Sequence, residues 1–161
     1  SLPAIGLGME KADDSLMELP PRPKTEGFFA NNLFVKIALE GMVIGLLTLV
    51  SYYIGSLTSE AVGHTMAFMT LGTCQLLHSY NTKSNHTVFS KKTFNNKVLN
   101  LAVLLGFALQ LCGIYIPGLN NVVFQFESLS IANLGISVGL AFVIVIVMEI
   151  AKLFKNNKKT K

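Results

Sequence analysis

The chain has 161 residues, 51% of them apolar and 14% charged, with a formal net charge of +4. Soluble domains typically carry roughly 25% charged residues, so this composition argues against a water-soluble globule and indicates a membrane protein. The charges gather in short segments between long uncharged stretches, which is the distribution that a bilayer imposes. The distribution of charges in a membrane protein therefore explains the net positive charge, which does not indicate nucleic-acid binding. We expect no nucleic-acid partner.

The chain begins with residues 1–32, which combine a short apolar piece, an acidic stretch and three prolines within four residues. Four apolar stretches of roughly 20 residues follow, the length at which a helix crosses a hydrocarbon core about 30 Å thick. They occupy residues 33–54, 61–79, 98–116 and 134–154. We predict an all-α fold in which residues 33–154 form a membrane bundle of four transmembrane helices and residues 155–161 form a basic tail.

The 13 lysine and arginine residues predict how these helices are oriented. The first and third loops, residues 55–60 and 117–133, contain none of them. The basic residues lie instead before or at the start of the first span, around the second loop, and at the C-terminal end. By the positive-inside rule, both ends and the second loop are cytoplasmic, so we expect a multi-pass protein of the cell membrane surrounded by lipid.

Two acidic residues fall within the predicted spans. Glu40 lies four residues after Lys36, and Glu149 lies three residues before Lys152. Each pair shares a helix face near the cytoplasmic end, where both side chains reach one another and the headgroups. We favour such structural pairing over a role in ion handling, although ionisable groups inside a membrane are functional candidates by default.

The histidines and cysteines do not form a metal-binding pattern. His64, His78 and His86 each lack a second ligand at helical spacing. Cys74 lies about 8 Å, and Cys112 about 21 Å, from the inner ends of their spans at about 1.5 Å per residue. A disulfide needs α-carbons within about 7 Å, so both thiols should be free. No catalytic motif is present, and we predict neither a catalytic nor a metal-binding residue.

The second predicted span has the most polar interior. Thr70, Thr73, Gln75 and Ser79 lie along its cytoplasmic half. Such side chains usually bond to a neighbouring helix or to their own backbone, which we favour over the lining of a cation path.

Two GxxxG motifs lie in the first and last spans. Small residues four apart allow helix backbones to approach closely in lipid. We therefore predict helix packing at Gly41, Gly45, Gly135 and Gly139.

Several short motifs are specific in order and spacing. They are Leu2-Pro3-Ala4 with Leu7-Gly8, Asp13, Leu16-Met17, Pro20-Pro21-Arg22, Thr70-Leu71-Gly72-Thr73-Cys74 with Leu77 and Ser79, Tyr115-Ile116-Pro117-Gly118-Leu119, and Glu149-Ile150-Ala151-Lys152. In this order they resemble the C-terminal membrane region of P-type cation-transporting ATPases, nearest to bacterial calcium pumps. The resemblance covers essentially the whole chain.

The resemblance implies that Ser1 is a cut end and that the preceding residue in the gene is Asp. Residues 1–32 would then hold the end of the pump's sixth membrane helix and a cytoplasmic loop, and the four spans would be its seventh to tenth helices. The intact pump would use ATP and Mg²⁺ and form an aspartyl phosphate. None of those parts lies in this segment, which would support the transport helices and have no activity alone.

Residue roles also follow from the resemblance. In two-site calcium pumps a Glu stands in the eighth helix where this chain has Gly72, so the resemblance implies one transported calcium per cycle. Asp13, Glu18 and Arg22 match the charged positions of a loop that couples the phosphorylation domain to the ion site, and a solvated acidic loop without that role is the alternative interpretation. The implied partners are the lipid bilayer, the remainder of the pump and the calcium ion.

Two other functions remain open from the sequence. One is a free-standing four-span membrane protein, such as a small channel or an accessory subunit. The other is the same region of a pump for another cation, because sodium, potassium, proton and manganese pumps share this fold.

Overall fold

The computed structural model describes residues 2–9, 33–83 and 95–157, and every regular element in these ranges is helical. Helix α1 spans Leu2–Gly8, α2 Leu33–Ser56, α3 Glu60–Lys83, α4 Lys97–Tyr115 and α5 Ile131–Asn157, and a short π-helix, η3, spans Leu119–Phe124. The four long helices overlap the four predicted apolar stretches. The all-α prediction and the place of each long helix are therefore confirmed.

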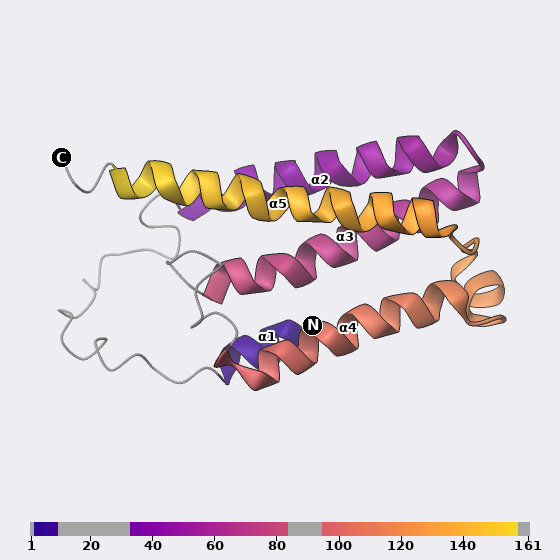
Figure 1. Cartoon of the computed structure of the whole chain (residues 1–161), viewed down its shortest axis with the longest axis horizontal. Coiled ribbons are helices and arrows are strands. Elements are labelled where there is room, and N and C mark those ends of the chain that lie inside the picture. Colours follow the sequence, from indigo (N-terminus) through magenta and orange to yellow (C-terminus); the bar gives the residue numbers. More distant parts are fainter. Residues whose placement is uncertain (1, 10–32, 84–94, 158–161) are drawn as a thin grey trace.

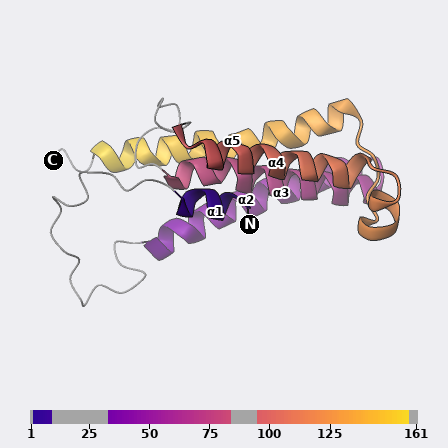
Figure 2. The ribbon, with the colours of Figure 1, turned by 90° about the horizontal axis from the view of Figure 1, so that it is seen from below.

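The long helices run alternately in opposite directions and lie side by side (Figure 1). α2 and α4 begin, and α3 and α5 end, at one end of the bundle. We call it the lysine end, because Lys36, Lys83 and Lys97 lie in the terminal turns of these helices. The opposite end carries the turn between α2 and α3 and the η3 segment. The short α1 packs against α4 at the lysine end (Figure 2).

Capping side chains explain where three of the helices begin. Ser59, Asn96 and Ser130 each accept a hydrogen bond from the backbone N–H three residues further on, at 3.1, 2.9 and 3.2 Å. This is the N-cap arrangement that satisfies a donor otherwise left over in the first turn. α4 ends before Pro117 and Gly118, whose φ of 95° is a left-handed conformation that favours glycine.

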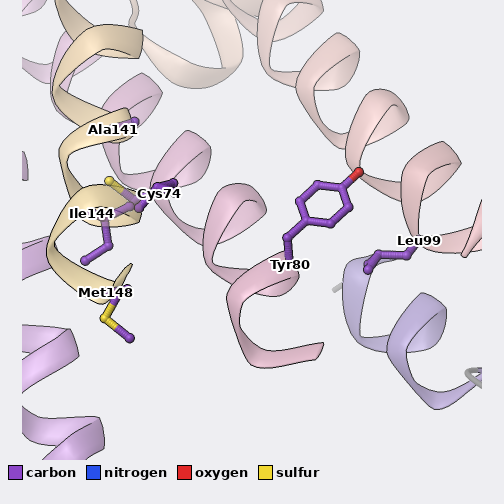
Figure 3. Close-up of a cluster of buried hydrophobic side chains, with 7 residues drawn as sticks. Cys74, Tyr80, Leu99, Ala141, Ile144 and Met148 are labelled. Carbon is purple, nitrogen blue, oxygen red and sulfur yellow. The ribbon is translucent and has the colours of Figure 1, made fainter. Parts of the chain in front are cut away.

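Helix α3 is the centre of the bundle, because it contacts α1, α2, α4 and α5. Five of the eight polar side chains buried among the described residues lie on α3: Thr65, Thr70, Thr73, Ser79 and Asn81. Apolar clusters lie around it in both halves of the bundle. In the half nearer the lysine end, Ala141, Ile144 and Met148 of α5 face Cys74, while Tyr80 points toward α4 (Figure 3).

Three helices, α2, α4 and α5, are long enough and apolar enough to cross a membrane. α3 is as long as α2, at 24 residues, but it is too polar to count as a candidate membrane span. The prediction of four transmembrane helices is therefore confirmed for three of them. The reason lies in the packing. α3 turns its polar side chains into the bundle, whereas Leu46 of α2, Leu104 of α4 and Ile146 of α5 belong to exposed apolar faces.

The closest helix contacts use glycines other than those predicted. A Cβ placed on Gly55 of α2 would lie 2.8 Å from Cα of Gly63 on α3, and one placed on Gly6 would lie 2.8 Å from Cα of Leu99 on α4. Gly41, Gly45, Gly135 and Gly139 are exposed, and a Cβ on any of them would meet nothing within 4 Å. These four glycines therefore make no close helix–helix contact within the described bundle. A GxxxG motif does not specify which helix face turns inward.

Candidate functional site

A polar face runs along the half of α3 nearer the lysine end. Gly72, Gln75 and Ser79 lie three and four residues apart, so they share one side of the helix. Together with His78 they line a cavity of about 280 Å³. Its other walls are Leu76 of α3, Pro3, Ala4 and Leu7 of α1, and Gln110 of α4. Much of this wall is apolar, and its polar groups are the amides of Gln75 and Gln110, the hydroxyl of Ser79 and the imidazole of His78.

The amide of Gln110 occupies the space beside Gly72. A Cβ placed on Gly72 would lie 2.5 Å from Oε1 and 2.7 Å from Cδ of Gln110. Oε1 of Gln110 is buried and accepts no hydrogen bond from the described residues. An unpaired buried polar atom costs about 1–3 kcal/mol, so this oxygen favours a donor or a cation in the cavity. None of the residues that line the cavity is a carboxylate.

An ion cluster joins α2 to α3 near the same cavity. Oε1 of Glu40 lies 3.6 Å from Nζ of Lys36, and Oε2 lies 3.4 Å from Nε2 of His78. The side chains of Glu40 and His78 are 12% and 25% exposed, compared with 52% for Lys36. The cluster therefore leads from an exposed ammonium group to a carboxylate and an imidazole inside the bundle, where ionisable groups are rare and mark candidate functional sites.

The predicted pairing of Lys36 with Glu40 is confirmed, but the contact between Glu40 and His78 was missed. Helical spacing cannot show it, because the two residues lie on different helices. Depth in the bundle could have shown it. Glu40 lies seven residues after the start of α2 at Leu33, and His78 lies five residues before the end of α3 at Lys83, so the antiparallel helices place them at similar levels.

Two of the four polar side chains predicted on α3 behave as predicted, whereas Oγ1 of Thr73 is buried without a hydrogen-bond partner among the described residues and Gln75 is exposed. The hydroxyl of Thr70 lies 2.7 Å from Oγ of Ser51 on α2 and 3.3 Å from the carbonyl oxygen of Ser137 on α5, and donates toward both. Ser79 donates to its own helix, at the carbonyl of Leu76, 2.6 Å away. Thr70 thus links three helices, and the prediction of bonding to neighbouring helices or to the backbone is confirmed for these two residues.

The other predicted residues contribute no further site. Cys74 and Cys112 are both free, as predicted. His64 lies at the opposite end of the bundle, 3.7 Å from Glu60, with both side chains exposed. No group of three or more His, Cys, Asp or Glu side chains that could hold a metal occurs among residues 2–9, 33–83 and 95–157.

Some predictions fall on residues that the structure does not describe. Asp13, Glu18 and Arg22, the predicted coupling residues, lie outside the described ranges, as does His86. The predicted partner of Glu149 is Lys152, whose side chain is likewise outside the described part.

Comparison with known proteins gives matches over nearly the whole chain. Residues 1–154 match the family described as "Cation transporting ATPase, C-terminus". The chain is 38% identical over 158 residues to a calcium-transporting ATPase of Listeria monocytogenes, 39% over 162 to calcium-transporting ATPase 1 of Lactococcus lactis, and 34% over 176 to calcium-transporting ATPase 1 of Bacillus cereus. These alignments cover 97%, 96% and 98% of this chain but 18%, 18% and 20% of the relatives. The chain thus spans about a fifth of the length of the curated relatives it matches.

Proposed function

The chain belongs to the family of cation-transporting ATPase C-termini, and on that basis we propose that it serves as the C-terminal membrane segment of an ATP-driven calcium pump. The observation that carries the proposal is the match over residues 1–154, together with three bacterial relatives that are named as calcium-transporting ATPases. A match that covers nearly all of this chain but a fifth of each relative favours a pump segment over a free-standing four-span protein.

The segment holds the transport helices in place and performs no chemistry by itself. The described residues offer no cluster of metal-ligating side chains, which supports locating the ATP and Mg²⁺ sites and the phosphorylated aspartate in the rest of the pump. α1 is the part of the segment that continues the sixth membrane helix. Its backbone is held against α4 by the close approach of Gly6 to Leu99 and by a hydrogen bond of 2.9 Å from Nδ2 of Asn96 to the carbonyl of Gly6.

All four long helices cross the membrane, and both ends of the segment are cytoplasmic. α3 has 24 residues, or about 36 Å at about 1.5 Å per residue, which exceeds a hydrocarbon core of about 30 Å. Its polar side chains can lie at bilayer depth because the surrounding helices shield them from lipid. The lysine end is the cytoplasmic end. The exposed glycines of α2 and α5, Gly41 and Gly45 with Gly135 and Gly139, then pack against membrane helices outside this chain.

The pump carries one calcium ion per cycle. Position 72 has no side-chain oxygen, and the neighbouring amide of Gln110 is neutral. A calcium ion takes six to eight oxygen ligands, usually with carboxylates among them, and the lining of this cavity includes none. A cavity with this lining therefore cannot replace a second carboxylate site.

The loop between α1 and α2 couples the segment to the phosphorylation domain through Asp13, Glu18 and Arg22. This role rests on the resemblance of that loop to the coupling loop of the family. A loop that contributes these charges at a domain interface transmits a conformational change without taking part in the reaction itself.

Transport by the full-length protein tests the proposal. Inside-out membrane vesicles that contain the protein should accumulate ⁴⁵Ca²⁺ only when ATP and Mg²⁺ are present. Vesicles without the protein, and uptake assays with manganese or sodium in place of calcium, are the controls. Uptake of another cation in preference to calcium would assign the segment to a different pump, and the absence of any ATP-driven uptake would contradict the proposal.

A further inference from the structure

We propose that Asn96 is a positioning residue for ion transport, which ties α1 to the start of α4 and thereby sets the affinity of the pump for its cation. The inference rests on the proposed function, in which α1 continues the sixth membrane helix. It assigns a role in transport to a side chain at the lysine end of the bundle.

Asn96 makes two hydrogen bonds, in two different directions. Its Oδ1 accepts a hydrogen bond from the backbone N–H of Leu99, 2.9 Å away, which caps α4. Its Nδ2 donates to the carbonyl oxygen of Gly6 in α1, also at 2.9 Å. A cap needs only a side-chain oxygen, and an ionised Asp would supply that oxygen without an amide donor. The bond to Gly6 therefore needs an explanation other than the start of α4.

The backbones of α1 and α4 touch at the same point. Pro3 and Gly6 are the buried residues of α1, and they lie three residues apart on one face. A Cβ placed on Gly6 would lie 2.8 Å from Cα and 3.2 Å from N of Leu99, closer than carbon atoms in contact normally approach. Leu99 is fully buried, and Figure 3 shows it beside α1. We call this contact of Gly6, Asn96 and Leu99 the α1–α4 joint.

The α4 side of the joint is fixed to the centre of the bundle. Asn100 lies one turn after Asn96, and its Oδ1 accepts a hydrogen bond of 3.0 Å from the hydroxyl of Tyr80 on α3. Tyr80 belongs to the apolar cluster that also contains Cys74 and Leu99. α3 in turn contacts α2 and α5. The joint therefore connects α1 to the part of the segment that is held by the most neighbours.

The side of α1 that faces the cavity has free space. Pro3, Ala4 and Leu7 line the cavity of about 280 Å³, and its remaining walls belong to α3 and α4. Leu2 lies four residues from Gly6, so a tilt of α1 by about 10° about the joint would move its start by about 1 Å at about 1.5 Å per residue. Binding sites work when their parts are held within about 0.5 Å and 10–20°. Freedom of this size would therefore disturb a cation site on the same helix.

Loss of the tether should weaken cation binding more than it slows turnover. Without the tether, α1 of the cation-free pump would populate several positions, and the apparent dissociation constant would rise as the competent fraction falls. A hydrogen bond of ordinary strength corresponds to about two- to tenfold in such an equilibrium. A saturating concentration of cation restores the competent position, so the maximal rate should change little.

A purely structural role at the start of α4 is the alternative, and two matched pairs of variants separate it from positioning. Asn96→Asp keeps the capping oxygen but removes the donor to Gly6, whereas Ser130→Ala removes the cap of α5 and leaves the joint intact. Gly6→Ala forces the two backbones of the joint apart, whereas a Cβ on Gly8, in the same helix, would meet nothing within 4 Å.

The test measures ATP hydrolysis by the full-length protein as the calcium concentration is varied, together with hydrogen exchange in residues 2–9. We expect Asn96→Asp and Gly6→Ala to raise the calcium concentration at half-maximal activity by about two- to tenfold, with little change in the maximal rate, and to speed the exchange. Ser130→Ala and Gly8→Ala should match the unmodified protein in all three quantities, although Ser130→Ala should lower the unfolding temperature.

The inference is refuted if Asn96→Asp leaves either the half-maximal calcium concentration or the exchange in residues 2–9 unchanged. It is also refuted if Ser130→Ala shifts the half-maximal concentration as much, because a general loss of stability would then explain the effect. If Gly6→Ala fails to fold, Asn96→Asp decides alone. An unmodified protein without calcium-stimulated ATP hydrolysis would refute the proposed function and this inference with it, whereas intact stimulation with the same calcium dependence in every variant would refute the inference alone.

Discussion

The substitution Gly55→Ala should separate α2 from α3. The added Cβ would lie 2.8 Å from Cα and 3.0 Å from N of Gly63, and 2.9 Å from Sδ of Met66. Carbon atoms in contact are normally about 3.5–4.0 Å apart, so the helices must move apart by about 0.7 Å or more. The methionine can turn away, but the backbone of Gly63 cannot. Overpacking of this kind costs about 1–3 kcal/mol, which exceeds the gain of up to about 1 kcal/mol from replacing glycine in a helix.

Thermal unfolding of the full-length protein in detergent measures this effect, with Gly41→Ala as the matched control. Gly41 lies on the same helix, and a Cβ there would meet nothing within 4 Å. We expect Gly55→Ala to lower the unfolding temperature and Gly41→Ala to leave it unchanged or raise it slightly. If the two variants had equal unfolding temperatures, or if Gly41→Ala lowered the unfolding temperature more, the close α2–α3 contact would not be at Gly55. The GxxxG motif of α2 would then be the better candidate for helix packing.

Three further substitutions test other contacts. Thr70→Val removes the hydroxyl that bonds to α2 and α5; it should cost about 0.6–1.7 kcal/mol in unfolding experiments, and a loss no greater than that of Thr70→Ser would argue against the network. Asn96→Ala removes both the N-cap of α4 and the hydrogen bond to the carbonyl of Gly6. It should lower the free energy of unfolding by about 1–2 kcal/mol and speed hydrogen exchange in residues 2–9. Unchanged exchange would argue against the contact between α1 and α4. Changing Asp13 and Glu18 together to Ala should slow ATP turnover by the full-length pump, and unaltered ATPase activity would identify them as solvated loop charges.

The sequence predicts the helices well because each depends on local features. The long apolar stretches, from which the helices are predicted, are visible in the printed chain. The structure adds the capping residues Ser59, Asn96 and Ser130, which mark where three helices begin and which the prediction does not use. The pairing of Lys36 with Glu40 is equally local, because residues four apart share a helix face. Elements and contacts of this kind need no knowledge of how the helices pack.

The remaining features depend on which face each helix turns inward, and this the sequence does not reveal. The GxxxG motifs mark small residues, yet the backbones meet at Gly55 and Gly63 because the faces that carry these two glycines pack together. Likewise, a low hydropathy makes α3 look like a weak membrane span, although five of its polar side chains are buried and four neighbouring helices contact it. The contact of Glu40 with His78 arises only after α2 and α3 are packed antiparallel.

Whether α3 crosses the membrane is the most direct test of the account, because a polar central helix shielded by its neighbours is what makes the segment a four-span bundle. Thr58 lies in the turn before α3, and Lys97 lies at the start of α4 beyond it, and both are exposed. In full-length protein with Cys74 and Cys112 replaced, Thr58→Cys and Lys97→Cys should react with a membrane-impermeant maleimide from opposite sides of sealed vesicles, Lys97→Cys from the cytoplasmic side. Labelling of both positions from the same side would show that α3 does not cross and would contradict the account.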